Sequence, residues 1–500
     1  MASEDPTPTA DNVPPLADRL FKGSALMIAM RWFVRLLGVI STAILARLLT
    51  PDDFGVIGLA IILAGFVSSI TDVGVVMALI QNTRAERKHY DSAWTIQIGQ
   101  STVVALVILL CAPFSGEYFG DDRVPAVLAL TAASIVVEGF INIGIADFRK
   151  KLQFGRDFLF SAVSRFLRLV ATIILAVVLR NYWAIAYGNL AGAAIDVALS
   201  YIMSAYRPRL SLAAVRELWS FSQWMLAINS IKFMLERGER FIIGRAISTE
   251  MFGFYSVGYD LASMPTIEVV MPIVRAVDAS VALIKDEADR LRGALVNLFS
   301  AVMLFALPCA LGFLMVSREF LIIVLGRPWL PALPIIKAAV IAATMEMMIL
   351  VVQRVLIRAD RIRTIGIITG LQMVVLLAAI YPIYSAFGLA AVIYGKAILS
   401  AVVLVIMAVI LGRQAGISAR SYFGAIIRPV LAAAAMVAVL QYVGGAEQWN
   451  VLAALLLKVG IGGTVYAGVI LALWLMAGRP DGAERFLIDK AASMLTRRSD

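Results

Sequence analysis

Apolar runs of about twenty residues, separated by short polar or Pro/Gly-containing breaks, repeat along nearly the whole chain. A helix of that length crosses the hydrocarbon core of a bilayer, which is roughly 30 Å thick. The pattern therefore predicts an all-α polytopic membrane protein with about fourteen transmembrane helices. They are expected at residues 24–48, 55–80, 92–114, 124–146, 158–180, 183–204, 220–247, 253–283, 294–316, 332–357, 365–387, 389–411, 426–444 and 451–477.

The polar breaks alternate in charge along the chain. Basic loops such as QNTRAERKHYD and DFRKKLQFGRD alternate with loops that are not basic, such as TPDDF and STEMF. Because lysine and arginine accumulate in cytoplasmic loops, we expect a multi-pass membrane protein with both termini in the cytoplasm. Residues 1–19 have no apolar segment or small-residue cleavage site, so they predict a disordered cytoplasmic tail and not a signal peptide.

One short pattern occurs twice. The chain reads ILARLLTPDDFGVIG at residues 44–58 and IIGRAISTEMFGFYS at residues 242–256. At a constant offset, identical residues fall at Ile44 and Ile242, Arg47 and Arg245, Phe54 and Phe252, and Gly55 and Gly253. A weaker correspondence links residues 184–202 with 391–409. Because an even number of spans separates the copies, we expect two similarly oriented six-helix lobes related by an axis along the membrane normal.

This duplication predicts the domain organisation. The lobes should cover residues 20–205 and 218–412, followed by two additional transmembrane helices within 426–477 and a cytoplasmic tail at 478–500. In the repeated pattern, arginine is expected to stabilise the C-terminal end of a helix. The glycine is expected to allow a tight turn into the next span.

The composition serves only to exclude some classes of protein and site. Hydrophobic residues make up 61% of the chain and charged residues 16%, which rules out a soluble multidomain protein. Both cysteines, Cys111 and Cys309, lie in apolar spans, which argues against a disulfide framework or a thiolate metal site. The single histidine, His89, is expected to be a solvated loop residue.

Motifs for catalysis are absent from the sequence. It contains no GxxxxGK[ST] phosphate loop, no HExxH and no CxxC. We therefore expect a protein that is not an enzyme, has no cofactor and does not bind nucleic acid.

Cationic side chains inside the apolar spans are the best indication of chemistry. Each costs roughly 2.5–3.5 kcal/mol near the centre of a lipid-facing helix. Arg354 and Lys337 lie near helix ends and can extend to the interface, and the others should face protein or a wet cavity. The full set of these cations is Arg31, Arg35, Arg165, Arg168, Lys232, Arg237, Arg240, Arg275, Lys337, Arg354, Lys396 and Lys458.

The spacing of these cations along their helices reduces the set to those that could bind substrate. Arg31 and Arg35 share one helix face without a carboxylate in their own helix, which favours an anionic ligand such as phosphate. The row from Lys232 to Arg240 also contains glutamates, so an internal salt-bridge ladder is an equally good interpretation. The residues predicted to bind substrate are Arg31, Arg35, Arg165, Arg168, Lys232, Arg237, Arg240 and Arg275. Asp72 and Asp260 are deeper acids that could couple transport to H⁺ or Na⁺.

The order of these motifs resembles a known family. The block from Lys22 to Ala60, ITDVGVVMALIQ and FGFYSVGYDLASMP are similar to Wzx-type polysaccharide flippases of the multidrug/oligosaccharidyl-lipid/polysaccharide exporter superfamily. The resemblance implies two lobes around a central cationic cavity, with the last two helices forming a lipid groove. It also implies transfer of undecaprenyl-pyrophosphate-linked oligosaccharide to the periplasmic leaflet by alternating access, for exopolysaccharide or lipopolysaccharide assembly, with polysaccharide polymerase and export machinery as partners.

Three alternatives remain at this stage. A lipid II flippase for peptidoglycan would carry a similar polyprenyl pyrophosphate. A cation or drug antiporter of the same superfamily would be expected to concentrate acids and not arginines in its lobes. A non-transporting partner of a polymerase or synthase complex is the third.

Overall fold

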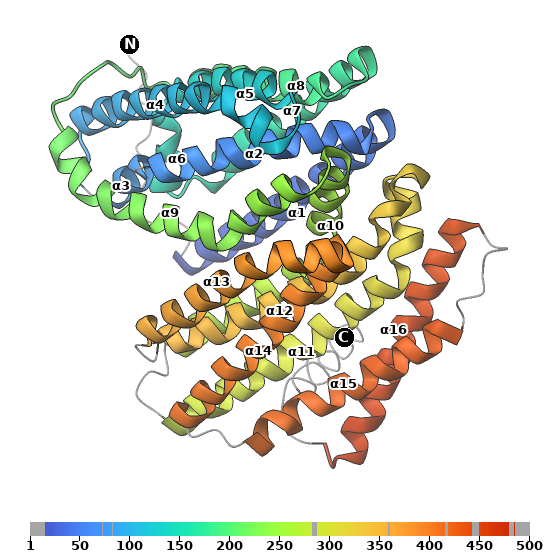
Figure 1. The fold of residues 1–500 in the computed structure, drawn as a ribbon. Coiled ribbons are helices and arrows are strands. Elements are labelled where there is room, and N and C mark those ends of the chain that lie inside the picture. Colours follow the sequence, from blue (N-terminus) through green and yellow to red (C-terminus); the bar gives the residue numbers. More distant parts are fainter. Residues whose placement is uncertain are drawn as a thin grey trace, which may run out of the picture. The chain divides into compact units, whose positions relative to one another are not determined.

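All regular secondary structure in the described part of the chain is helical. A computed structural model describes residues 16–72, 74–82, 84–282, 288–358, 361–415, 419–442, 450–479 and 485, and these contain no strand. Several helix side chains lie outside this description, among them those of Arg31, Lys232, Glu236 and Arg275. The expectation of an all-α fold is confirmed (Figure 1).

The helices fall into two compact units, divided after Arg237. The first contains α1 (Leu16–Leu48), α2 (Pro51–Thr71), α3 (Val75–Gln81), α4 (Arg87–Phe119), α5 (Val124–Gly139), the 3-10 helix η2 (Ile143–Ile145), α6 (Ala146–Lys150), α7 (Phe154–Leu179) and α8 (Trp183–Met203). The helix α9 (Val215–Ala246) crosses the division. The second unit continues with α10 (Thr249–Ala282), α11 (Ala288–Val324), η3 (Arg327–Ala332), α12 (Leu333–Arg358), α13 (Ile362–Phe387), α14 (Leu389–Ala415), α15 (Ala419–Tyr442) and α16 (Val451–Met476).

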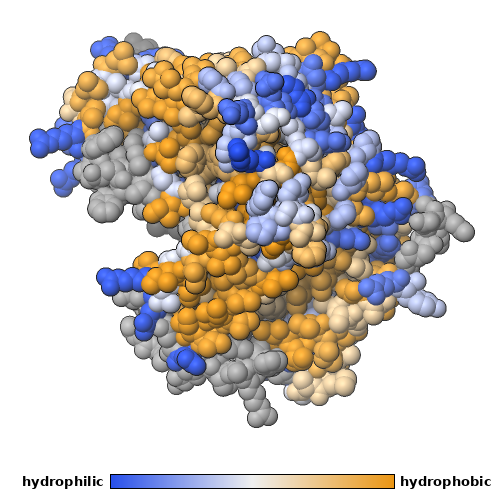
Figure 2. Space-filling model, in the orientation of Figure 1, coloured by the Kyte–Doolittle hydropathy of each residue, from blue (hydrophilic) through white to orange (hydrophobic). Residues whose placement is uncertain are grey.

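Ten helices within the described residues are long and apolar enough to cross a membrane. An eleventh span results if α5 and the η2–α6 segment, bent by 66° at their junction, count as one. Large apolar side chains such as Phe114, Ile202 and Phe387 are exposed, as lipid-facing residues are. Figure 2 shows apolar surface spread over much of the visible face. A membrane protein is therefore confirmed, while the expected total of about fourteen spans stays a prediction.

The two units repeat the same order of helix neighbours. In the first, α2 packs on α4 and α5, α4 on α5, and α8 on α5 and α7. In the second, α10 packs on α11 and α12, α11 on α12, and α14 on α12 and α13. This correspondence is what an internal duplication predicts. The boundaries expected for the individual domains stay predictions.

The repeated turn is made by helix caps. Thr50 Oγ1 accepts from Asp53 N at 3.3 Å, and Thr50 N donates to the Asp53 carboxylate at 2.9 Å, which forms a capping box at the start of α2. In the second copy, Ser248 Oγ accepts from Met251 N at 3.3 Å. The polar residue at the same position of both copies therefore begins the next helix.

The role expected for the repeated glycines is wrong. Gly55 and Gly253 lie buried inside α2 and α10, and neither has a positive φ. The chain already turns before them, at the capping residues, so no unusual backbone is needed there. The arginines do lie where expected, since Arg47 is in the last turn of α1 and Arg245 in the last turn of α9.

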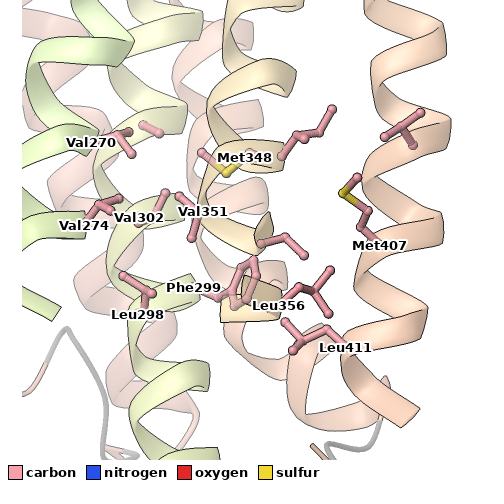
Figure 3. Packing of buried hydrophobic residues seen from close by; sticks show 14 residues of the cluster. Val270, Val274, Leu298, Phe299, Val302, Met348, Val351, Leu356, Met407 and Leu411 are labelled. Atoms are coloured by element: carbon pink, nitrogen blue, oxygen red, sulfur yellow. The ribbon is translucent and has the colours of Figure 1, made fainter. Parts of the chain in front are cut away.

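The second unit has a dry core. Buried side chains from α10, α11, α12 and α14 pack together around Val302, Met348 and Met407 (Figure 3). This cluster holds together α10, α12 and α14, three of the four helices that carry the charged groups described below.

The helices α15 and α16 are attached to α11 by polar contacts as well as apolar ones. Lys458 on α16 forms a buried ion pair with Glu319 on α11, with 2.7 Å between Nζ and Oε1. Tyr466 on α16 donates to the carbonyl oxygen of Leu304 on α11 at 2.7 Å. That carbonyl would normally accept from the backbone four residues on, but Pro308 has no N–H. The tyrosine replaces the missing helical hydrogen bond.

We therefore expect Tyr466→Phe to lower the free energy of unfolding by about 1–3 kcal/mol, because it leaves a buried carbonyl without a donor. Tyr442→Phe, at a fully exposed tyrosine of α15, is the matched control. Unfolding of the purified protein in detergent measures both. Equal stability of Tyr466→Phe and the parent protein would show that the carbonyl is satisfied in another way.

Candidate functional site

The first unit contains a charged cluster between three apolar helices. Arg168 on α7 donates to Asp196 on α8 at 2.7 Å, and its guanidinium lies 3.5 Å from Glu138 on α5. Ser164, one turn earlier on α7, donates to the same Asp196. The guanidinium is thus shared by two carboxylates, so its charge is neutralised within the protein.

Two glycines of α8 make room for this cluster. A Cβ at Gly192 would lie 2.5 Å from Arg168 Nε, and a Cβ at Gly188 would lie 2.4 Å from Thr172 Oγ1. Both glycines are buried on the side of α8 that faces α7. Small residues four apart allow the two helices to approach closely, as in other membrane helix pairs.

Gly192→Ala is expected to displace the Arg168 side chain and to lower the yield of folded protein several-fold, because an ion pair between spans is broken. Gly155→Ala is the control, since a Cβ on that α7 glycine would meet no atom within 4 Å. Size-exclusion profiles of the two variants measure the effect. A normal profile for Gly192→Ala would mean that α7 and α8 can separate without cost.

The second unit holds a larger cluster, centred on Lys396 of α14. Its ammonium group lies 2.6 Å from Glu239 Oε1 of α9 and 2.6 Å from Glu346 Oε1 of α12. It also donates to the hydroxyl of Tyr259 on α10 at 2.9 Å. One lysine therefore connects four helices.

Two tyrosines complete the ring of contacts around this ammonium. Tyr259 donates to Glu346 Oε2 at 2.9 Å, and Tyr255 donates to Glu239 Oε1 at 3.2 Å. The residues are four apart, so both hydroxyls project from one face of α10. The buried carboxylate of Glu239 and the partly exposed carboxylate of Glu346 thus each receive a hydrogen bond in addition to an ion pair.

Arg240 extends the cluster toward its exposed side. Its guanidinium donates to Asp260 Oδ1 at 3.0 Å and lies 5.6 Å from the centre of the Tyr259 ring. The Arg240 side chain is 10% exposed, whereas that of Asp260 is 60% exposed. Three carboxylates therefore face two cations, and the surplus negative charge can reach water.

Free space beside this cluster is small. Tyr255, Lys396 and apolar residues of α13 and α14 line a cavity of about 10 Å³. That volume holds about one water molecule. The cluster, in this conformation, is an ion network and not a substrate pocket.

The cations expected to bind substrate lie in different surroundings. Arg168 and Arg240 are in the two clusters, each held by carboxylates. Arg165 and Arg237 are exposed and form no ion pair within the described part of the chain, and Arg35 is half-buried on α1. The side chains of Arg31, Lys232 and Arg275 lie outside the described residues, so the salt-bridge ladder from Lys232 is not described. The substrate-binding set as a whole stays a prediction.

The two acids expected to couple ions also differ. Asp260 pairs with Arg240, as described. Asp72 ends α2, where its carboxylate accepts from Gly74 N at 2.9 Å and from Asn229 Nδ2 at 3.1 Å. Asp72 is thus a helix-end residue in a bend.

Lys396 was among the internal cations found in the sequence, but its place at the centre of this cluster was not predicted. Its partners come from three other helices, so no local spacing indicated them. The four-residue spacing of Tyr255 and Tyr259 was the available signal.

His89 is buried, so the expectation of a solvated loop residue is wrong. It lies in the first turn of α4, where Nδ1 accepts from Glu86 N at 3.0 Å and Nε2 donates to Glu217 at 2.9 Å. The hydrogen bond from His89 lowers the pKa of the Glu217 carboxyl. His89 therefore ties the start of α9 to the start of α4.

Residues 44–334 match the model of a family described as polysaccharide biosynthesis protein. The chain belongs to this family. The match includes both copies of the repeated turn and every residue of the two clusters except Glu346 and Lys396.

Relatives within the family share low identity with the chain. It is 22% identical over 310 residues to the lipopolysaccharide biosynthesis protein WzxC of Escherichia coli strain K12, covering 60% of this chain and 62% of that protein. It is 21% identical over 299 residues to the succinoglycan biosynthesis transport protein ExoT of Rhizobium meliloti, covering 59% and 60%. The alignments span less than two thirds of either relative.

Solved structures share the fold. The lipid II flippase MurJ in an inward closed conformation superposes with a TM-score of 0.68 at 12% identity, covering 90% of this chain and 99% of that one. An inward-facing multidrug resistance transporter of the MATE family, in the MOP superfamily, gives 0.58 at 11% identity, covering 77% and 96%. The chain therefore has the same fold as these transporters.

Proposed function

We propose that this protein flips undecaprenyl-pyrophosphate-linked oligosaccharide from the cytoplasmic to the periplasmic leaflet of the bacterial inner membrane. Membership of the polysaccharide biosynthesis family supports a lipid-linked sugar as cargo. The observation that supports the chemical assignment is the set of cations in apolar helices, of which Arg165 and Arg237 form no ion pair within the described residues.

The arginines of α1 and α7 are the proposed pyrophosphate ligands. Phe33 contacts Phe158 with 6.2 Å between ring centres, and Leu45 packs near Ala176 further along both helices, so α1 and α7 run parallel. With a rise of 1.5 Å per residue, Arg35 and Arg165 then lie at levels about 8 Å apart. Guanidinium groups at such neighbouring levels can bind the oxygens of a diphosphate bidentately.

The cluster around Lys396 is proposed to couple transport to an ion. A proton or sodium ion entering from the exposed Asp260 side would cancel the surplus negative charge. Lys396 would then hold Glu239 and Glu346 less tightly, and the four helices it connects could rearrange. This role extends the coupling proposed for Asp260 and includes Asp72 as the acid of the first unit.

Transport in vesicles tests the proposal. Purified protein in liposomes should expose undecaprenyl-pyrophosphate-linked oligosaccharide to an impermeant oxidant, while lipid II and a cationic dye remain protected. Protein-free liposomes are the control. Transport of lipid II at an equal rate would favour the peptidoglycan alternative, and movement of the dye alone would favour the antiporter.

A further inference from the structure

The first unit encloses a cavity of about 330 Å³ at the break between α5 and α6. Residues of α3, α4, α5, α6 and α7 line it, all within the same unit. This volume is at the lower end of pockets that hold small organic ligands, about 300–1,000 Å³. Broken membrane helices are tolerated where they line a cavity, and they often mark binding sites.

Hydrogen bonds within the protein hold the segments around this cavity in place. Gln97 on α4 donates its amide hydrogens to the carbonyl oxygens of Gly139 and Ile141, at 3.0 and 3.1 Å, where the helix is interrupted. Asn142 donates through its backbone to Ser200 Oγ at 2.9 Å and through its side chain to Tyr206 O at 2.7 Å. The amide donors along the break are therefore occupied by the protein.

The remaining hydrogen-bonding capacity consists mainly of acceptors. Within the described residues, no hydrogen bond reaches Gln97 Oε1 or the hydroxyl of Ser101, and both residues line the cavity. Glu138 also lines it, and its carboxylate side chain is 43% exposed. A ligand that donates hydrogen bonds can be accepted by all three of these groups.

The charges around the cavity lead to the same conclusion. Asp157 and Glu138 face Arg149 as the one cation among the described lining residues, and Arg149 already binds Asp157 with 3.1 Å between Nε and Oδ1. Within the described residues, Glu138 pairs with Arg168 at 3.5 Å, and that guanidinium lies closer to Asp196, at 2.7 Å. The lining carries one surplus negative charge, which disfavours phosphate and favours a cation.

We propose that this cavity binds a primary ammonium group, with Glu138 as its counter-ion and Gln97 and Ser101 as further acceptors. Apolar side chains such as Phe160 and Ile135 cover the rest of the lining, so the amine belongs to an organic molecule. An aminophospholipid headgroup and a free amine present the same chemistry. The bound ammonium competes with Arg168 for Glu138, which connects this site to the charged cluster of α7 and α8.

Thermal unfolding of the full-length protein in nanodiscs tests this site. In the bilayer, phosphatidylethanolamine is compared with phosphatidylcholine. In solution, ethanolamine is compared with choline. Phosphatidylglycerol makes up the rest of the bilayer in every sample. We expect stabilisation by at least one of the two primary amines and little by its quaternary counterpart, which has no N–H to donate. An effect of phosphatidylethanolamine alone identifies the lipid, and an effect of ethanolamine identifies a free amine.

Substitutions locate the effect. Glu138→Gln is expected to weaken binding of the effective amine about tenfold or more, and Ser101→Ala to weaken it by a smaller factor, because each removes an acceptor of a charged donor. Glu117→Gln, at an exposed glutamate of α4, is the control and should bind normally. No stabilisation by either amine, equal stabilisation by choline and ethanolamine, or unchanged binding in Ser101→Ala and Glu138→Gln would overturn the proposal.

Discussion

Replacing Lys396 with methionine is expected to lower the free energy of unfolding by about 3–5 kcal/mol, because it leaves the buried carboxylate of Glu239 without its counter-ion. The ammonium lies 2.6 Å from both Glu239 and Glu346, and the side chains of Lys396 and Glu239 are about one-tenth exposed. The loss of stability should affect α9, α10, α12 and α14 together, since Lys396 lies on α14 and forms polar contacts with the other three helices.

A double substitution distinguishes the effect of an unpaired charge from the effect of lost packing. Lys396→Met combined with Glu239→Gln should recover much of the lost stability, because one unpaired charge is removed. Lys337→Met, at an exposed lysine of α12, is the control. Equilibrium unfolding in mixed micelles measures all three. If Lys396→Met were as stable as the parent, the cluster would contribute no net stability, and its proposed part in coupling would lose its physical basis.

Arg35→Ala is expected to reduce transport of the lipid-linked oligosaccharide about 10- to 100-fold at matched protein levels, because a charge-assisted hydrogen bond contributes roughly 1.5–3 kcal/mol. Lysine at the same position should restore only part of the rate, since it keeps the charge but loses the bidentate geometry. Arg31→Ala should act in the same direction, because the two residues share a helix face.

The control for these variants is Arg363→Ala, an exposed arginine of α13. It changes the net charge equally but lies at the start of a helix outside the proposed site. Normal transport by the Arg31→Ala, Arg35→Ala double variant would remove this pair from the proposed site. Arg165 and Arg237 would then be the next candidates to test, since both are exposed and neither forms an ion pair within the described residues.

Much of the fold could be predicted from the sequence because a membrane helix is determined by a short continuous stretch of residues. Twenty apolar residues are sufficient to indicate a span, and loop charge and the repeated turn are read without tertiary contacts. The capping residues Thr50 and Ser248 were in the repeated pattern, although the glycines beside them received the role of making the turn. Glycines inside a helix and glycines in a turn look alike in a single sequence.

The candidate site was harder to predict, because its contacts join distant segments. The partners of Arg168 lie on α5 and α8, and those of Lys396 on α9, α10 and α12. Sequence spacing finds neighbours on the same helix, so it found the Arg165–Arg168 pair but not the carboxylates that neutralise one member. For the same reason it placed His89 in solvent, although Glu217 and the start of α9 bury it.

The proposal that internal arginines hold the diphosphate is tested most directly by comparing one glycan on undecaprenyl pyrophosphate and on undecaprenyl monophosphate, in vesicles containing the purified protein. We predict that the parent protein moves the pyrophosphate form about tenfold faster or more, and that the Arg31→Ala, Arg35→Ala double variant moves both forms slowly and at equal rates. Equal rates for the two forms with the parent protein, or a preference unchanged in the double variant, would contradict it.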